Sequence, residues 1–158
     1  MVGGMAHRQP PDMEPVLDVQ RVVVVDDEPH TQAIQRTLDV LERSPNRAVV
    51  IHTAFVDDGV ALAGLVAGAS AVVAKSDLGN ELTDAVRAAA RGGSLRPRIT
   101  IDALVEAAGV VDPDDIPILS MLVHGTSPAG IGEVLGVHER ELAGRRKRML
   151  KALLGDLR

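Results

Sequence analysis

Three short apolar runs alternate with helical patterns in the first part of the chain, and this alternation limits the fold more than any other feature. The runs are RVVVVD at 21–26, RAVVIHT at 47–53 and SAVVAK at 70–75. Continuous apolar runs of this length are typical of strands buried on both faces. Because helices separate the strands, we expect a parallel sheet with right-handed crossovers.

The helical patterns lie between and after these strands, at 31–41, 57–68 and 82–93. The first pattern places Ile34, Leu38 and Leu41 on one face, and Thr31 is its expected N-cap. An aspartate precedes the second helix, and two glycines end the third. The first 93 residues therefore predict an α/β unit.

After residue 93 the pattern becomes entirely helical. Segment 94–111 is predicted to be a linker that contains a helix at 101–109. Asp112 and Ser127 each precede a proline, the arrangement typical of a capped helix start. A third helix at 137–154 has inward-facing apolar residues at Leu142, Met149, Leu150 and Leu153. Short helices joined by a glycine-containing turn predict a helix-turn-helix.

Composition excludes several kinds of protein. The 158 residues contain no cysteine, so disulfides, thiolate metal sites and cysteine nucleophiles are ruled out. No apolar run approaches the ~20 residues of a membrane helix, so we expect no membrane association. Residues 1–20 lack the apolar stretch of a signal peptide and predict a flexible tail, which together indicate a cytoplasmic protein.

The charges are distributed unevenly along the chain. Residues 1–111 hold ten Lys and Arg against fifteen Asp and Glu, whereas residues 112–158 hold seven of each. Six of those last seven bases fall between Arg140 and Lys151. Such a stripe indicates an anionic partner, with a merely solvated helix face as the alternative.

Longer motifs carry a family resemblance. ILSMLVHGTSPAGIGEVLGVHERELAGRRKRML resembles the C-terminal DNA-binding domain of LuxR-type (NarL/FixJ-like) regulators. VVVVDDEP, VVIHTAF and AGASAVVAK resemble strands of a response-regulator receiver. The resemblance implies a shortened flavodoxin-like receiver of about three parallel strands at 21–93, followed by an all-α helix-turn-helix domain at 112–158. It also implies a DNA-binding transcriptional regulator of the response-regulator class, related to two-component systems.

The receiver-like part has a shortened phosphorylation site. Only 25 residues lie between Asp27 and Thr53, and a full receiver needs roughly 45 more there. If the first strand is the receiver's first, Asp26 and Asp27 are the metal pair and the phosphoacceptor strand is missing. If it is the third, Asp26 is at the acceptor position and the metal pair is missing. In either alignment Thr53 and Lys75 keep their places.

These four residues (Asp26, Asp27, Thr53 and Lys75) form what we call the remnant receiver site. Forming an aspartyl phosphate needs a carboxylate nucleophile, a divalent cation and a cationic side chain together. Asp26 and Asp27 are candidate ligands for a weakly bound Mg²⁺, the only cofactor that the sequence suggests. Since neither alignment is complete, we expect phosphorylation-independent function, no catalytic residue and no histidine kinase partner.

The predicted helix at 137–154 is the one expected to contact DNA bases. The resemblance places the following residues near double-stranded DNA: Ser127, Arg140, Glu141, Arg145, Lys147, Arg148 and Lys151. Ala143 and Gly144 replace polar base-contacting residues of the family, which leaves Arg145 as the best candidate for a guanine contact. Lys147 is expected to contact phosphate, and a homodimer is expected to present two such helices to paired half-sites.

Two other functions remain open. A protein-binding adaptor would use the same helices without DNA. A small phosphohydrolase of the haloacid-dehalogenase type would also have a strand ending in Asp, then a Thr and a Lys, but it needs an Asp where this chain has Glu28. Retention or loss of DNA binding by the purified protein distinguishes the regulator from the adaptor.

Overall fold

A computed structural model describes residues 21–26, 29–77, 79–95 and 98–156. The predicted tail at 1–20, as well as Asp27 and Glu28, lie outside the described residues. The strands are β1 (Val22–Val25), β2 (Ala48–Thr53) and β3 (Ala71–Ala74). They form one parallel sheet in the order β1-β2-β3, which confirms the predicted sheet.

Burial differs between the strands because β2 alone has a neighbour on each side. Val49, Val50 and Ile51 of β2 are fully buried. β1 lies at an edge of the sheet, and its Val24 is 43% exposed. The prediction that the first strand is buried on both faces is therefore wrong. Val24 lies on the face of the sheet that a single helix, at residues 81–90, covers.

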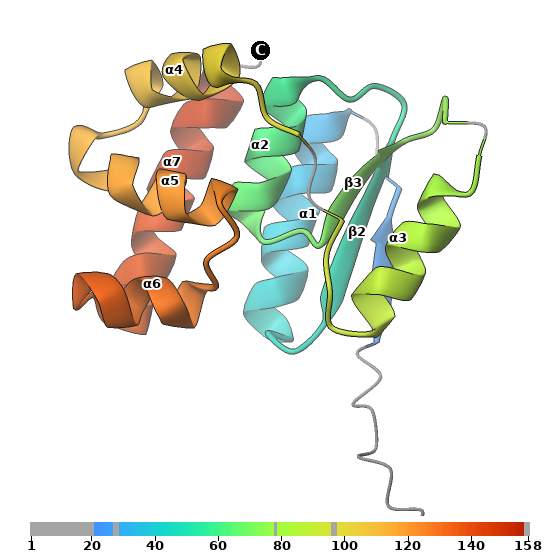
Figure 1. Cartoon of the computed structure of the whole chain (residues 1–158), viewed down its shortest axis with the longest axis horizontal. Helices are drawn as coiled ribbons and strands as arrows, with labels where there is room; N and C mark the ends of the chain where they lie inside the picture. Colours follow the sequence, from blue (N-terminus) through green and yellow to red (C-terminus); the bar gives the residue numbers. More distant parts are fainter. Residues whose placement is uncertain (1–20, 27–28, 78, 96–97, 157–158) are drawn as a thin grey trace, which may run out of the picture.

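Helices cover both faces of the sheet (Figure 1). α1 (His30–Arg43) and α2 (Asp58–Ala67) lie on one face, and α3 (Glu81–Ala90) lies on the other. α1 begins one residue before the predicted start, and its N-cap is Pro29, which makes no side-chain cap hydrogen bond. Thr31 lies inside the helix, so its prediction as N-cap is wrong.

α2 lies at the centre of the molecule. Asp57 caps it as predicted, because its Oδ1 accepts a hydrogen bond from the Val60 amide at 2.8 Å. Seven of its ten residues are buried. A helix that is apolar on every side is expected to be covered on every side, and α2 packs against α1, β3, α5 and α7.

The C-terminal part is entirely helical, as predicted. It contains α4 (Ile101–Val110), a short 3₁₀ helix η1 (Pro113–Asp115), α5 (Ile116–Val123), α6 (Pro128–Leu135) and α7 (Glu139–Asp156). Asp112 and Ser127 cap η1 and α6 through their side-chain oxygens, which confirms both caps. None of the described helices is both long and apolar enough to cross a membrane.

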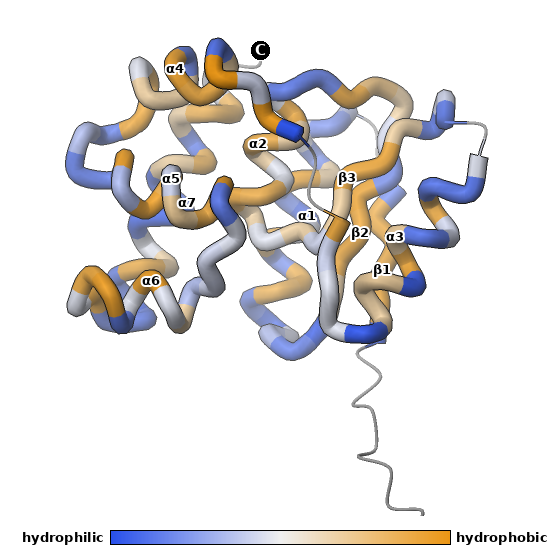
Figure 2. The backbone as a smooth tube through the Cα atoms, viewed as in Figure 1, coloured by the Kyte–Doolittle hydropathy of each residue, from blue (hydrophilic) through white to orange (hydrophobic). Residues whose placement is uncertain are grey.

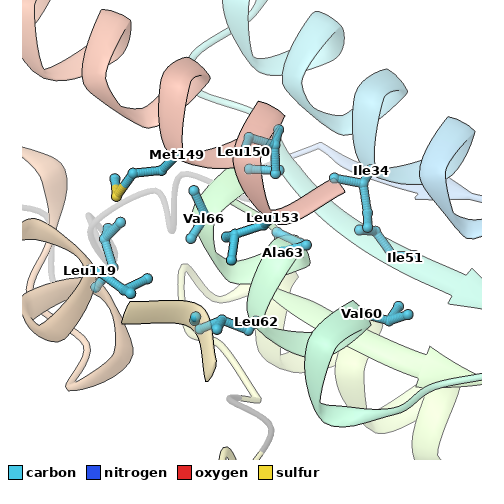
Figure 3. Close-up of a cluster of buried hydrophobic side chains, with 14 of the residues drawn as sticks. Ile34, Ile51, Val60, Leu62, Ala63, Val66, Leu119, Met149, Leu150 and Leu153 are labelled. Carbon is cyan, nitrogen blue, oxygen red and sulfur yellow. The ribbon is translucent and has the colours of Figure 1, made fainter. Parts of the chain in front are cut away.

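One apolar core extends from the sheet to α7 (Figure 3). Leu62, Ala63 and Val66 of α2 lie between the sheet and the inner face of α7. In Figure 2 the strands and α2 are mostly hydrophobic, in contrast to the polar turn that follows α1. The division into two domains stays a prediction, but the cluster of buried side chains runs across it. Its α7 members are the four inward residues predicted from the sequence: Leu142, Met149, Leu150 and Leu153.

Candidate DNA-binding surface and remnant receiver site

The carboxyl ends of the strands bring part of the remnant receiver site together. Asp26 follows β1 and Lys75 follows β3, and their Oδ1 and Nζ atoms lie 2.5 Å apart. His52 of β2 approaches the same carboxylate, with its Nδ1 3.8 Å from Oδ2. Thr53 is fully buried, and its carbonyl accepts a hydrogen bond from the Lys75 amide at 2.7 Å. Parallel strands place their carboxyl ends at one edge, which explains this convergence.

At this edge of the sheet, neighbouring side chains offset the negative charge of Asp26. The hydrogen bond from Lys75 lowers the pKa of the Asp26 carboxyl below its ordinary value, and the positive charge of Lys75 and the nearby His52 act in the same direction. Asp27, the other candidate Mg²⁺ ligand, lies outside the described residues. Among the residues that are described, no group of three or more His, Cys, Asp or Glu could hold a metal ion.

The strand order bears on the two alignments. A flavodoxin-like receiver has the order 2-1-3-4-5, so its third, fourth and fifth strands are neighbours in chain order. The order β1-β2-β3 matches those three strands without rearrangement. If β1 were the receiver's first strand, it would have to occupy the position of the receiver's missing third strand, beside the fourth. The order is therefore the one expected if Asp26 lies at the acceptor position.

The helix-turn-helix is formed by α6, a short turn and α7. The Ser127 hydroxyl accepts a hydrogen bond from the Gly130 amide at 3.1 Å, which fixes the start of α6. Gly136 ends the helix with φ +65°, a left-handed conformation that favours glycine. The Arg140 amide donates to Nδ1 of His138 at 3.3 Å, so this imidazole occupies the capping place at the start of α7.

α7 has one buried face and one exposed face. At 100° per residue, Arg140, Arg148 and Lys151 lie on the side opposite the buried leucines and Met149. We call these three exposed cations the basic face of α7. Gly144 lies between them, and a side chain added there would meet no atom within 4 Å. Within the described ranges, Arg140 and Lys151 form no ion pair.

Two predicted DNA-contacting arginines converge on one buried carboxylate. Arg148 donates to both oxygens of Asp115, from Nε at 2.9 Å and from Nη2 at 2.8 Å. The Nε atom of Arg145 lies 3.4 Å from the same Asp115 and 3.8 Å from Glu141. Asp115 is fully buried, and its hydrogen bonds raise the pKa of Arg148. A planar guanidinium suits this two-pronged geometry, which a lysine could not provide.

The two bases between Arg145 and Arg148 contact the sheet part of the molecule. Lys147 forms an ion pair with Glu42 at the end of α1. Arg146 donates two hydrogen bonds to the Val66 carbonyl in α2, from Nε at 3.1 Å and from Nη2 at 3.0 Å. Burial lowers the pKa of Arg146. Arg146 thus contributes to packing between α7 and α2 near the carbonyl end of α2, where a cation is favoured.

Sequence reasoning did not find Asp115, Glu42 or His52 as partners of these charged residues. In the sequence, 33 residues separate Asp115 from Arg148. Spacing along a helix finds partners three or four residues apart, but it gives no signal for pairs between distant elements.

Comparison with known proteins found a curated relative, and no family model matches the chain. The relative is the uncharacterized transcriptional regulatory protein YxjL of Bacillus subtilis (strain 168). It is 27% identical over 160 aligned positions, which cover 93% of this chain and 70% of the relative. The relative's description agrees with the resemblance in the sequence motifs.

Solved structures of response regulators show a looser likeness. RcsB of Salmonella typhimurium is 19% identical, with a TM-score of 0.44 over 87% of this chain and 75% of that one. A complex of the two-component response regulator RcsB with DNA is 18% identical, with a TM-score of 0.42 over 87% of this chain and 74% of that one.

Proposed function

We propose that this chain is a DNA-binding transcriptional regulator that holds double-stranded DNA through the basic face of α7. The observation that carries the proposal is the surplus of positive charge on the outer side of the second helix of a helix-turn-helix. Arg140 and Lys151 are exposed, unpaired within the described ranges, and fixed to a helix whose inner face is fully packed. A rigid row of cations suits the phosphates of a duplex.

Base selection is the weaker part of this function. Arg145 is tied to Asp115 and Glu141, so a guanine contact would require it to exchange these partners for a base edge. Ala143 and Gly144 offer no hydrogen bond to bases. The regulator is therefore expected to bind with a modest sequence preference and a large dependence on salt. A cytoplasmic location follows from this function.

Phosphorylation is not part of the proposed mechanism. The carboxylate of Asp26 is already paired with Lys75, and Mg²⁺ would need oxygen ligands beyond this one side chain. Incubation with acetyl phosphate and Mg²⁺ should leave the intact mass unchanged. A stoichiometric phosphate adduct that disappears in Asp26→Asn would refute phosphorylation independence.

The proposed regulator acts as a homodimer. β1 is an edge strand whose one strand neighbour among the described residues is β2, and the side chain of Val24 is partly exposed on the sheet face that α3 covers incompletely. Exposed edges and apolar side chains favour pairing with a second copy. Sedimentation should detect a dimer at roughly tens of micromolar protein, the range of a moderate-affinity interface. A folded monomer throughout that range would contradict the dimer.

DNA titration tests the function itself. Fluorescence anisotropy of labelled random-sequence duplexes should show saturable binding whose affinity falls steeply between about 50 and 200 mM salt. The alternative, a protein-binding adaptor, predicts no binding to random or genomic fragments even at low salt. The adaptor would then be the better description of the same helices.

A further inference from the structure

A cavity of about 690 Å³ opens between α1, α6 and α7. Its apolar wall includes Leu38 and Leu41 of α1, Val137 of the turn and Leu142 of α7. The volume lies within the range of small-molecule sites in proteins, which are concave and mostly apolar with few polar groups. Nothing in the proposed binding of DNA uses this space.

The wall carries two cations, Arg146 and Lys147, and two carboxylates, Glu42 and Glu139. Among the described residues, Arg146 and Glu139 form no ion pair, with each other or with another residue. Lys147 is neutralised by its ion pair with Glu42. Arg146 lines the same cavity, but its hydrogen bonds go to the uncharged Val66 carbonyl through Nε and Nη2. Across the described ranges, Arg146 has no carboxylate partner. A largely buried guanidinium without a counter-charge favours an anion nearby.

We propose that this cavity binds a small anion with an apolar body, such as a medium-chain carboxylate, whose charged group pairs with Arg146. The apolar body would contact the leucines of α1 and α7, while the carboxylate would accept hydrogen bonds from the guanidinium. The proposal does not depend on DNA binding.

Octanoate, octanol and acetate serve as matched probes, because they separate the apolar chain from the charge. Amide chemical shifts of the full chain should move saturably with octanoate at residues that line the cavity, such as Ala67, Gly132 and Ala143. Dissociation constants on the order of 1 mM or tighter are expected for a ligand of this size. Octanol should bind more weakly, and acetate should not bind at the same residues.

Variants at three positions decide the role of Arg146. Arg146→Met should weaken octanoate binding about ten- to hundredfold, the value of a hydrogen bond to a charged group, and leave octanol unchanged. Arg140→Met, an equal loss of charge on the exposed side of the same helix, should bind octanoate as the natural chain does. If Arg146→Met does not fold, Arg146→Lys should keep the preference for octanoate, and Ala129→Phe should reduce binding of both probes by filling the cavity.

Three results would overturn the proposal. The first is the absence of saturable shifts with octanoate up to about 10 mM, well above the expected dissociation constant. The second is octanol binding as tightly as octanoate. The third is octanoate binding that stays unchanged in a folded Arg146→Met or in Ala129→Phe.

Discussion

The carboxyl edge of the sheet and the outer side of α7 both carry charged side chains, but they balance them differently. At the sheet edge, Asp26 faces Lys75 and His52, so the charges are matched locally. On α7, Asp115 and Glu42 hold some of the bases, and Arg140 and Lys151 remain in excess. Phosphoryl transfer needs every component of its site at once, whereas holding a phosphate needs only surplus positive charge on a rigid element. The proposed function therefore depends on α7 and not on the sheet edge.

Both regions depend on α2, which packs against α1 and β3 on one side and α7 on the other. Leu62→Ala should lower the free energy of unfolding by about 2–5 kcal/mol, because it leaves a cavity in the shared core. Thermal unfolding should then show one transition at a lower temperature for signals from the sheet and from α7 alike. Val134→Ala, at a side chain 70% exposed, should change the stability by less than about 0.5 kcal/mol. Separate transitions for the two parts would show that they do not share a core.

Asp115 is where the comparison can be sharpened, because it pairs with Arg145 and Arg148 and so neutralises charge that could otherwise bind phosphate. Asp115→Asn should destabilise the fold by about 1–3 kcal/mol through weakened hydrogen bonds to a buried carboxylate. DNA affinity at low salt should rise, since the two arginines are then released. Asp114→Asn makes the same change in net charge at an exposed position. Equal affinities of these two variants would mean that Asp115 does not restrain the arginines.

The smallest expected effect concerns the titration of Asp26. Its pKa is lowered in the folded chain, so its ion pair stabilises the fold above the ordinary carboxyl range and is lost as the pH falls through the lowered value. The carboxyl chemical shifts of Asp26 should titrate below the ordinary range of an aspartate. In Lys75→Met the same titration should move upward, because the hydrogen bond that is the largest cause is gone. An unmoved titration would mean that Lys75 does not hold this carboxylate.

Local patterns were sufficient to predict much of this molecule. Alternating apolar runs gave three parallel strands, and the caps at Asp57, Asp112 and Ser127 follow from short-range preferences. The cap at Thr31 failed because Pro29 starts the helix earlier. Pattern rules also missed the exposure of Val24, which depends on how many strands and helices surround it.

The long-range pairs of the site could not be predicted in this way. Residues 42 and 147 meet only because α1 and α7 both pack beside α2, and nothing in either local sequence encodes that meeting. The segment that forms α2 is apolar on every side, so a second layer of helices was to be expected beyond it.

The most direct test of the central claim removes the surplus charge from α7 and measures DNA binding against salt. The double variant Arg140→Gln, Lys151→Gln should bind all sequences more weakly and to the same degree, and its salt slope should become shallower by about 0.9 for each phosphate that is no longer neutralised. The double variant Arg87→Gln, Arg91→Gln removes the same charge from the α3 segment, on the far face of the sheet, and should bind DNA as the natural chain does. If both double variants bind DNA equally weakly, or both bind it as the natural chain does, the basic face of α7 is not the DNA-binding surface.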